Sequence, residues 1–173
     1  MARLLINKND FIDYKQVSKA RDIAAIESVI QEAQDIDLKA LICREFFYDI
    51  LNNYQQEIYQ KLIHGETYTD NDGNVVEFKG LKAVLVNFAY ARYVLRGHMN
   101  DTAFGMVQKT TEFSQPISAS EKRDVRDRSI ADANGYWQEC KLYLKEKEDL
   151  FPKWKDCNKC EGSTSRAFKT STI

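Results

Sequence analysis

Glycine, proline and histidine are scarce in this sequence of 173 residues, which contains seven, two and two of them. The glycines are isolated from one another, so the chain lacks a glycine-rich loop of the kind that holds a phosphate group. The scarcity of glycine and proline also indicates few long loops. Helix-forming residues dominate and alternating strand patterns are rare. The sequence therefore predicts a mainly helical protein.

Cysteine is also rare, and no apolar stretch near the N-terminus is long enough for a signal peptide. We therefore expect synthesis in a reducing cytoplasm, where thiols stay reduced. Cys157 and Cys160 have the spacing of half a zinc ribbon, but a structural zinc site needs four ligands. The remaining candidates are not paired at ligand spacing: Cys43, Cys140, His64 and His98. We predict no metal or cofactor, with Cys157 and Cys160 as weak metal candidates and a small zinc or redox protein as one alternative.

A strong excess of either charge is absent, because 25 basic and 26 acidic residues give a net charge of −1. This balance does not favour general attraction to nucleic acid or to acidic membranes. Residues 156–173 are polar and rich in Ser, Thr and Lys. We predict a helical domain over residues 1–155 and a flexible tail over residues 156–173 that becomes ordered on a partner. Truncation after Phe151 is expected to leave the fold intact.

The most apolar stretch of the chain covers residues 81–97. Apolar residues recur at helical spacing and widen into nearly the whole circumference, as expected for a helix that other helices cover. Lys82, Arg92 and Arg96 interrupt the stretch, and charges inside a bilayer are costly. The sequence predicts a helical bundle around this central helix and no membrane contact.

Three further features flank the central helix. The Asp72-Gly73 pair lies between β-forming residues and predicts a short hairpin over about residues 67–79. An EF-hand is excluded, because Val75 and Leu81 stand where its glycine and glutamate should be. Ser118 and Glu121 form a capping box, which predicts a long C-terminal helix over about residues 120–150. Residues 98–120 show no helical stripe and are expected to be a binding or assembly loop.

Two helices are expected before the hairpin. The first ends near Ala33, the rhythm breaks over residues 34–37, and the second runs to about Asn53. Asn9 or Asp10 is expected to cap a short turn near the N-terminus.

Catalytic chemistry finds no support in the sequence. Neither a Ser-His-Asp nor a Cys-His pairing can be justified, and the carboxylates on helix faces have basic neighbours. We therefore predict that the protein is not an enzyme. Arg123, Arg126 and Arg128 leave open a soluble regulatory or nucleic-acid-binding module as a second alternative, although Asp124 and Asp127 lie among them.

The order of features resembles a known family. Its elements are the Glu-Ala-Gln-Asp-Ile-Asp-Leu-Lys-Ala-Leu-Ile run (32–42), Ala-Tyr-Ala-Arg-Tyr (89–93), the Thr-Ala-Phe-Gly-Met-Val loop (102–107), Ala-Asn-Gly-Tyr-Trp (133–137), Tyr-Leu (143–144) and Phe-Pro (151–152). This order is similar to the head-to-tail adaptor, or head-completion, proteins of tailed bacteriophages, and most similar to those of crAss-like phages. The resemblance covers about residues 1–155.

The resemblance implies a virion structural protein without an active site, assembled in the host cytoplasm. Copies would form a ring, of twelve by the family pattern, that extends the DNA channel between the portal protein and the next ring or tail protein. The partners implied are further copies, these two proteins, and genomic DNA without sequence specificity. The assembly residues that we assign on this basis are Thr102, Phe104, Met106, Gln108, Lys109, Phe113, Arg123, Arg126, Trp154, Lys155 and Phe168.

Overall fold

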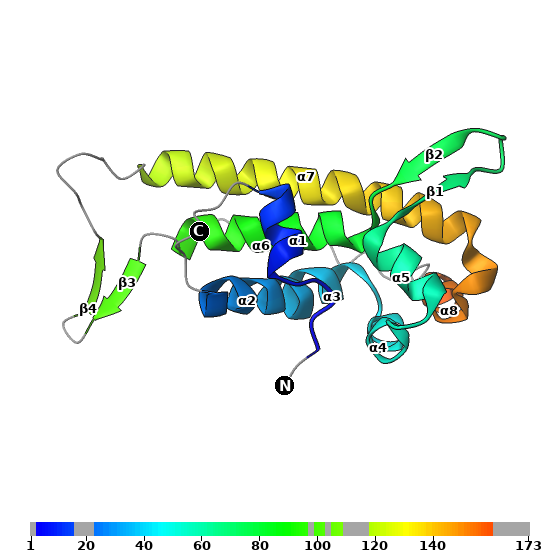
Figure 1. The fold of residues 1–173 in the computed structure, drawn as a ribbon, viewed down its shortest axis with the longest axis horizontal. Coiled ribbons are helices and arrows are strands. Elements are labelled where there is room, and N and C mark those ends of the chain that lie inside the picture. The colour runs from blue at the N-terminus through cyan, green and yellow to red at the C-terminus, as the bar shows by residue number, and fades with distance from the viewer. Residues whose placement is uncertain (1–2, 16–22, 97–98, 103–104, 109–117, 161–173) are drawn as a thin grey trace, which may run out of the picture.

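The computed structural model describes residues 3–15, 23–96, 99–102, 105–108 and 118–160 (Figure 1). It is mainly helical with a short antiparallel hairpin of β1 and β2, as the sequence predicts, and with a second hairpin of β3 and β4 where the sequence predicted a loop. In chain order the elements are α1 (Lys8–Tyr14), α2 (Ile23–Glu32), the π-helix η1 (Ala33–Leu38), α3 (Lys39–Leu41), α4 (Arg44–Asn53), α5 (Glu57–His64), β1 (Glu66–Thr69), β2 (Val75–Phe78), α6 (Gly80–Arg96), β3 (Met99–Thr102), β4 (Gly105–Gln108), α7 (Ala119–Glu146), the 3-10 turn η2 (Glu148–Leu150) and α8 (Pro152–Cys160).

Helix α6 is the centre of the fold, and the prediction of a central helix over residues 81–97 is confirmed within one residue. Figure 1 shows α6 between α7 on one side and α2 with α3 on the other, with α1 crossing its face. Its residues from Leu81 to Ala89 are buried except for Lys82, so nearly every face of this part of α6 is covered. Among the described residues, no helix has both the length and the apolar character needed to cross a membrane.

The capping box predicted at the start of the last helix is confirmed. The Ser118 side chain accepts a hydrogen bond from the backbone N–H of Glu121, and the Glu121 carboxylate accepts one from the backbone N–H of Ser118. The N-terminal prediction is corrected, because the cap of α1 is Asn7. Asp10 supplies the reciprocal bond to the Asn7 N–H, so it occupies the third helical position of this capping box.

The predicted break over residues 34–37 is wrong. The chain stays helical there by widening into the π-helix η1, and the break comes later, where Ile42 and Cys43 are extended. The chain stays helical at residue 34 because the buried Gln34 side chain hydrogen-bonds to the N-terminal arm. The Gln34 side chain accepts from the N–H of Leu5 at 2.8 Å and donates to the carbonyl of Arg3 at 2.9 Å. This pairing fixes the N-terminal arm against the π-helix.

The predicted hairpin forms from β1 and β2, with Glu66 opposite Phe78. Gly65 and Gly80 meet at its base, where α5 ends and α6 begins. Both have positive φ, and a Cβ at Gly65 would lie 2.1 Å from the carbonyl oxygen of Phe78. A Cβ at Gly80 would lie 2.5 Å from the backbone nitrogen of Gly65. These positions therefore require glycine, because backbone atoms cannot move aside as a flexible side chain can.

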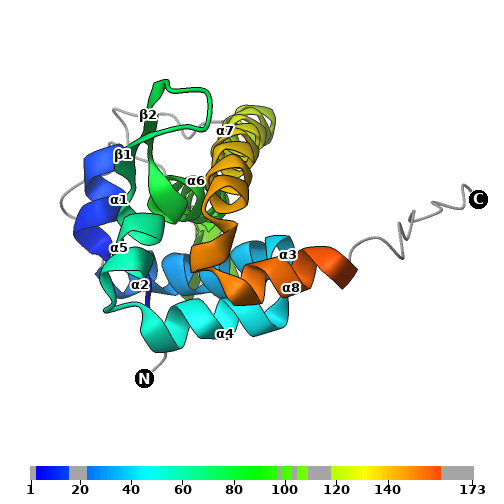
Figure 2. The same ribbon diagram turned by 90° about the vertical axis from the view of Figure 1, so that its right-hand side faces the viewer.

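The predicted boundary between domain and tail at residue 156 falls inside α8. Pro152 occupies the first turn of this helix, where its missing N–H costs nothing. Figure 2 shows α8 lying alongside α4. Phe151 and Trp154 are buried, and both rings contact Phe46 of α4. The folded part of the chain therefore continues at least through α8, and truncation after Phe151 would remove core residues.

Candidate assembly surfaces

The first candidate surface is the hairpin of β3 and β4, which extends from the helical body in the described part of the chain. Met99 pairs with Gln108 and Thr102 with Gly105 in an antiparallel register. Figure 1 shows this hairpin standing off one end of the body, beyond α6 and α7. Both outer strand edges carry backbone groups that the hairpin itself does not pair. The predicted assembly residues Thr102, Met106 and Gln108 lie on these strands.

A hollow of about 340 Å³ lies between α6 and α7 near the same end of the body. Phe88, Leu95 and Ile130 give it an apolar lining, and Leu95 is 37% exposed. Asp37, Arg92 and Arg126 add charge, and the remaining lining residue is Ala91. Such a hollow can accept an apolar side chain of a partner. The charges around it can pair with polar residues next to that side chain.

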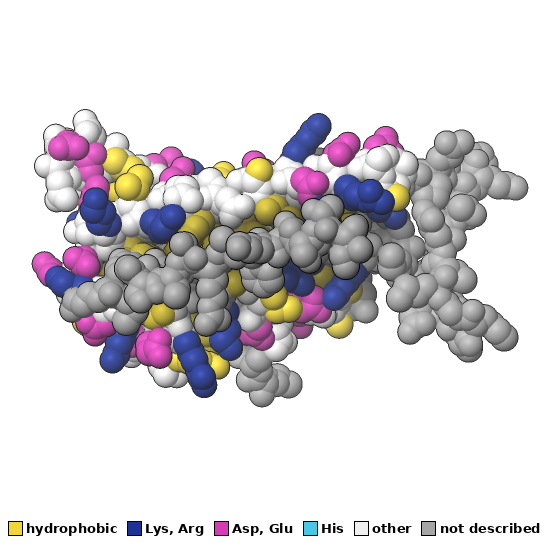
Figure 3. Space-filling model, turned by 180° about the vertical axis from the view of Figure 1, so that it is seen from behind, with side chains coloured by type: hydrophobic (Ala, Val, Ile, Leu, Met, Phe, Trp, Pro, Cys, Tyr) yellow, Lys and Arg dark blue, Asp and Glu magenta, His cyan; other side chains and the backbone are white. Residues whose placement is uncertain are grey.

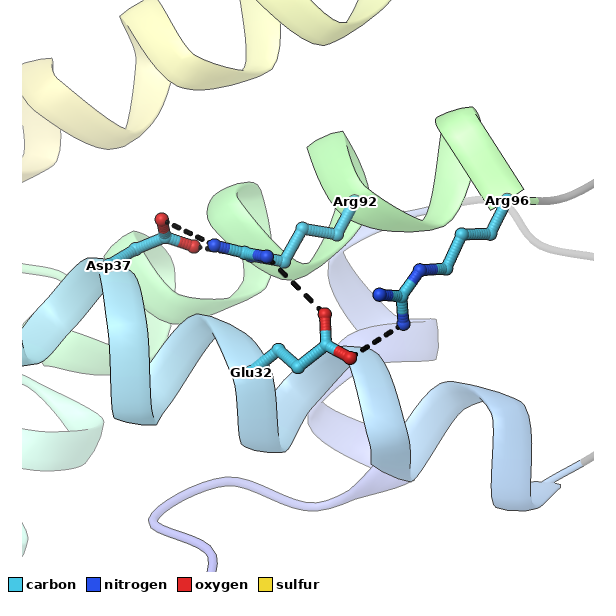
Figure 4. A network of polar contacts seen from close by, with 4 residues as sticks. All are labelled: Glu32, Asp37, Arg92 and Arg96. Atoms are coloured by element: carbon cyan, nitrogen blue, oxygen red, sulfur yellow. Dashed lines mark hydrogen bonds and ion pairs between the residues drawn. The ribbon is translucent and has the colours of Figure 1, made fainter.

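Four charged residues on α2, η1 and α6 form a network beside this hollow (Figure 4). Arg92 donates two hydrogen bonds to Asp37, at 2.7 and 2.9 Å, and one to Glu32 at 3.3 Å. Arg96 donates to the other oxygen of Glu32 at 2.7 Å. The hydrogen bonds to Asp37 raise the pKa of the Arg92 guanidinium. The network fastens η1 to α6 and fixes the charges that border the hollow.

The sequence does not reveal this network, because Asp37 and Arg92 are 55 positions apart. The π-helix is part of the reason that both carboxylates reach α6. Glu32 and Asp37 are five residues apart, which is the hydrogen-bond spacing of a π-helix and not that of an α-helix. A pattern search at α-helical spacing places these two residues on different faces.

The predicted arginines lie on the N-terminal half of α7. Arg123 and Arg128 are exposed, whereas Arg126 is half-buried and donates to the adjacent Asp127 at 2.6 Å. Figure 3 shows acidic and basic side chains mixed over the face that it displays. The mixture does not favour a phosphate-binding surface, since neighbouring carboxylates repel phosphate.

Two predicted interface residues on α8 have partners within the chain. Trp154 is 6% exposed and packs on Phe46 and Trp137, so its assignment as an assembly residue is corrected to a core residue. The Lys155 ammonium lies 3.6 Å from Glu148 and 3.5 Å from Asp149. These carboxylates, Glu148 first, raise the pKa of Lys155. The other predicted positions, Phe104, Lys109, Phe113 and Phe168, lie outside the described residues.

A second exposed apolar surface lies at the opposite end of the body, which the sequence did not indicate. Val75 on β2 is 75% exposed and Leu142 on α7 is 60% exposed. Leu142 also lines a hollow of about 140 Å³ together with Val76 and Phe78. We call Val76, Phe78 and Leu142 the hairpin face. Val75 lies on the other side of β2, because alternate residues of a strand face opposite ways. The members of the hairpin face could not be grouped from the sequence, because β2 and α7 meet only in the folded chain.

Two cysteines that the sequence did not pair meet between α4 and α8. The structure joins Cys43 and Cys157 as a disulfide, with their Cα atoms 5.9 Å apart. Cys140 is a free, buried cysteine, and burial raises the pKa of its thiol. The sequence predicted that the thiols are reduced. In the structure Cys43 and Cys157 form a disulfide instead. Cys160 is the last residue of α8.

Comparison with known proteins gives a family but no activity. A family model described as "Family of unknown function (DUF6712)" matches residues 38–164. The chain belongs to this family. The DUF6712 match begins at the end of η1 and includes α6, α7 and both hairpins, so the surfaces described above lie within it except for Asp37. No curated protein and no solved structure matches the chain.

Proposed function

We propose that this DUF6712 protein is a structural subunit of a tailed-bacteriophage virion, and that its copies form a ring between the portal and the tail. The observation that carries this proposal is the β3–β4 hairpin standing off the helical body. A lone two-stranded hairpin is at best marginally stable in water. It gains stability when another chain adds a strand to its edge or covers its face.

The position of the two exposed surfaces supports a ring. Head-to-tail contacts between copies need two different complementary surfaces, and they generate a closed ring when the rotation between copies closes. The β3–β4 hairpin and the α6–α7 hollow lie at one end of the body, and the hairpin face lies at the other (Figure 1). We propose that a second copy occupies each of these surfaces.

The charge distribution supports passage of DNA without sequence recognition. Acidic and basic groups are nearly equal in number over the chain. Each phosphate contact adds affinity that falls with salt, so a channel of mixed charge holds DNA weakly. In this proposal the ring extends the DNA channel beneath the portal and takes part in head completion, genome retention and ejection. Its further partners are the portal protein and the next ring or tail protein.

The experiment that tests this function replaces residues 97–117 with a short Gly-Ser linker between α6 and α7. The proposal predicts that the full chain sediments as a large oligomer, alone or with portal protein, and that the linker variant sediments as a monomer. The melting temperature of the variant monomer should stay close to that of the full-length monomer, because the hairpin stands off the body. A variant that assembles as well as the full chain would refute the role of the hairpin.

A control for assembly comes from the charged turns of α7. Arg128→Gln removes an exposed charge outside the predicted assembly residues, the hairpin and the core. This variant is expected to retain the oligomer, with at most a change in its salt dependence. Gel-shift titration of the same samples across salt tests the nucleic-acid alternative. A steep fall in DNA affinity with salt that becomes shallower in the Arg128→Gln protein would favour that alternative.

A further inference from the structure

The contact between α4 and α8 brings together a set of side chains that can bind a metal ion. The sulfur atoms of Cys43 and Cys157 and a carboxylate oxygen of Glu45 lie within 4.8 Å of one another. They come from parts of the chain 114 residues apart. We propose that, when the two cysteines are reduced, this cluster is a Zn²⁺ site that fastens α8 to the start of α4.

The chemistry of the three groups matches zinc. Thiolate sulfur and carboxylate oxygen are both established zinc ligands, and structural sites are four-coordinate. A water molecule can take the fourth position, as it does at zinc sites with three protein ligands. Calcium and magnesium prefer oxygen ligands only, so the two sulfurs favour zinc over either of them.

The local structure holds both sulfur atoms in place. Cys43 is the N-cap residue of α4, and its sulfur accepts a hydrogen bond from the backbone N–H of Phe46 at 3.5 Å. Cys157 lies opposite, with its sulfur 2.9 Å from the carbonyl oxygen of Lys153.

Glu45 would supply an oxygen ligand to the reduced pair. A disulfide is uncharged and gains little from a carboxylate close by. With zinc bound, two thiolates and a carboxylate carry three negative charges at short distance, and the divalent cation reduces the net charge of the site to −1. Cys43 and Cys157 are half-buried and Glu45 is exposed, so an ion can reach the cluster from solvent. Reduction of the disulfide adds two electrons and two protons, and the protons leave as zinc binds.

The experiment uses the full chain, reduced with a phosphine reductant and stripped of metal, then titrated separately with Zn²⁺ and Co²⁺. We expect one ion per chain and, with Co²⁺, the absorption of a cobalt–thiolate bond. Cys43→Ser and Cys157→Ser should each weaken zinc binding at least tenfold. Glu45→Gln should weaken it about tenfold, and because this side chain is exposed the variant should still fold.

Cys140→Ser is the matched control, because Cys140 is a free cysteine buried away from the cluster. It should bind zinc as the wild type does, and zinc should raise the melting temperature of both. A reduced wild-type chain that binds no zinc would overturn the proposal and leave the disulfide alone as the link between α4 and α8. Equal zinc affinity of the wild type and the Cys43→Ser and Cys157→Ser variants would overturn it as well. Neither result depends on ring assembly.

Discussion

Gly65 and Gly80 show how single residues fix the direction of the chain. Their backbones approach closely where α5 leads into the hairpin and the hairpin leads into α6. The sequence indicates that Gly65 ends a helix, since glycine suits that position. It does not indicate that Gly80 faces Gly65, because that contact depends on the closed hairpin between them.

Gly80→Ala is expected to destabilise the protein by at least about 2 kcal/mol, because it adds a positive-φ penalty to a clash with backbone atoms. Gly73→Ala has the positive φ but no atom within 4 Å, so it should cost about 1 kcal/mol. Gly135→Ala lies in open space on α7 and should stabilise by about 0.5–1 kcal/mol. Urea unfolding measures the free energy of unfolding of the three variants. If Gly80→Ala did not lose the most stability, the backbone contact between Gly65 and Gly80 would not be rigid.

Arg92 tests the charged network. Arg92→Met removes three hydrogen bonds to Asp37 and Glu32, and the expected loss is about 1–3 kcal/mol because the groups are partly buried. Arg96→Met is the matched change. Its side chain is 54% exposed and pairs with Glu32, so its loss should stay below about 1 kcal/mol. Equal losses in urea unfolding would contradict the central position given to Arg92.

At the scale of elements, those with a strong local sequence signal could be predicted, whereas those that depend on long-range contacts could not. The apolar stripe of α6, the Asp-Gly hairpin and the Ser118–Glu121 capping box each lie within a short window. Helix α8 has no such signal, because its sequence is polar apart from Trp154 and its cysteines. It is ordered by contacts with α4, which lies about a hundred residues earlier in the chain.

Helix α8 is therefore expected to contribute to stability. Trp154→Ala should cost about 3–5 kcal/mol, since the ring is buried against Phe46 and Trp137. Truncation after Phe151 should cost at least as much, whereas truncation after Cys160 retains α8 and serves as the control. Thermal melting followed by circular dichroism compares the three. A truncation after Phe151 that melts like the full chain would show that α8 is not part of the core.

At the scale of the whole molecule, the described part of the chain leaves surfaces exposed at both ends of the body. The β3–β4 hairpin and the α6–α7 hollow lie at one end, and the hairpin face lies at the other. The sequence predicted an irregular segment between helices where β3 and β4 lie, and it did not predict that these two strands pair. The hairpin face was not predicted, because its residues look like ordinary positions of a strand and a helix.

Electron microscopy of the purified full chain, alone and mixed with portal protein, tests the ring most directly. We predict closed rings with a central channel, and a native mass that is an integral multiple of the chain, with twelve as the expected number. The linker variant without residues 97–117 should give no rings under the same conditions. A chain that stays monomeric at every concentration, with and without portal protein, would contradict the proposed function.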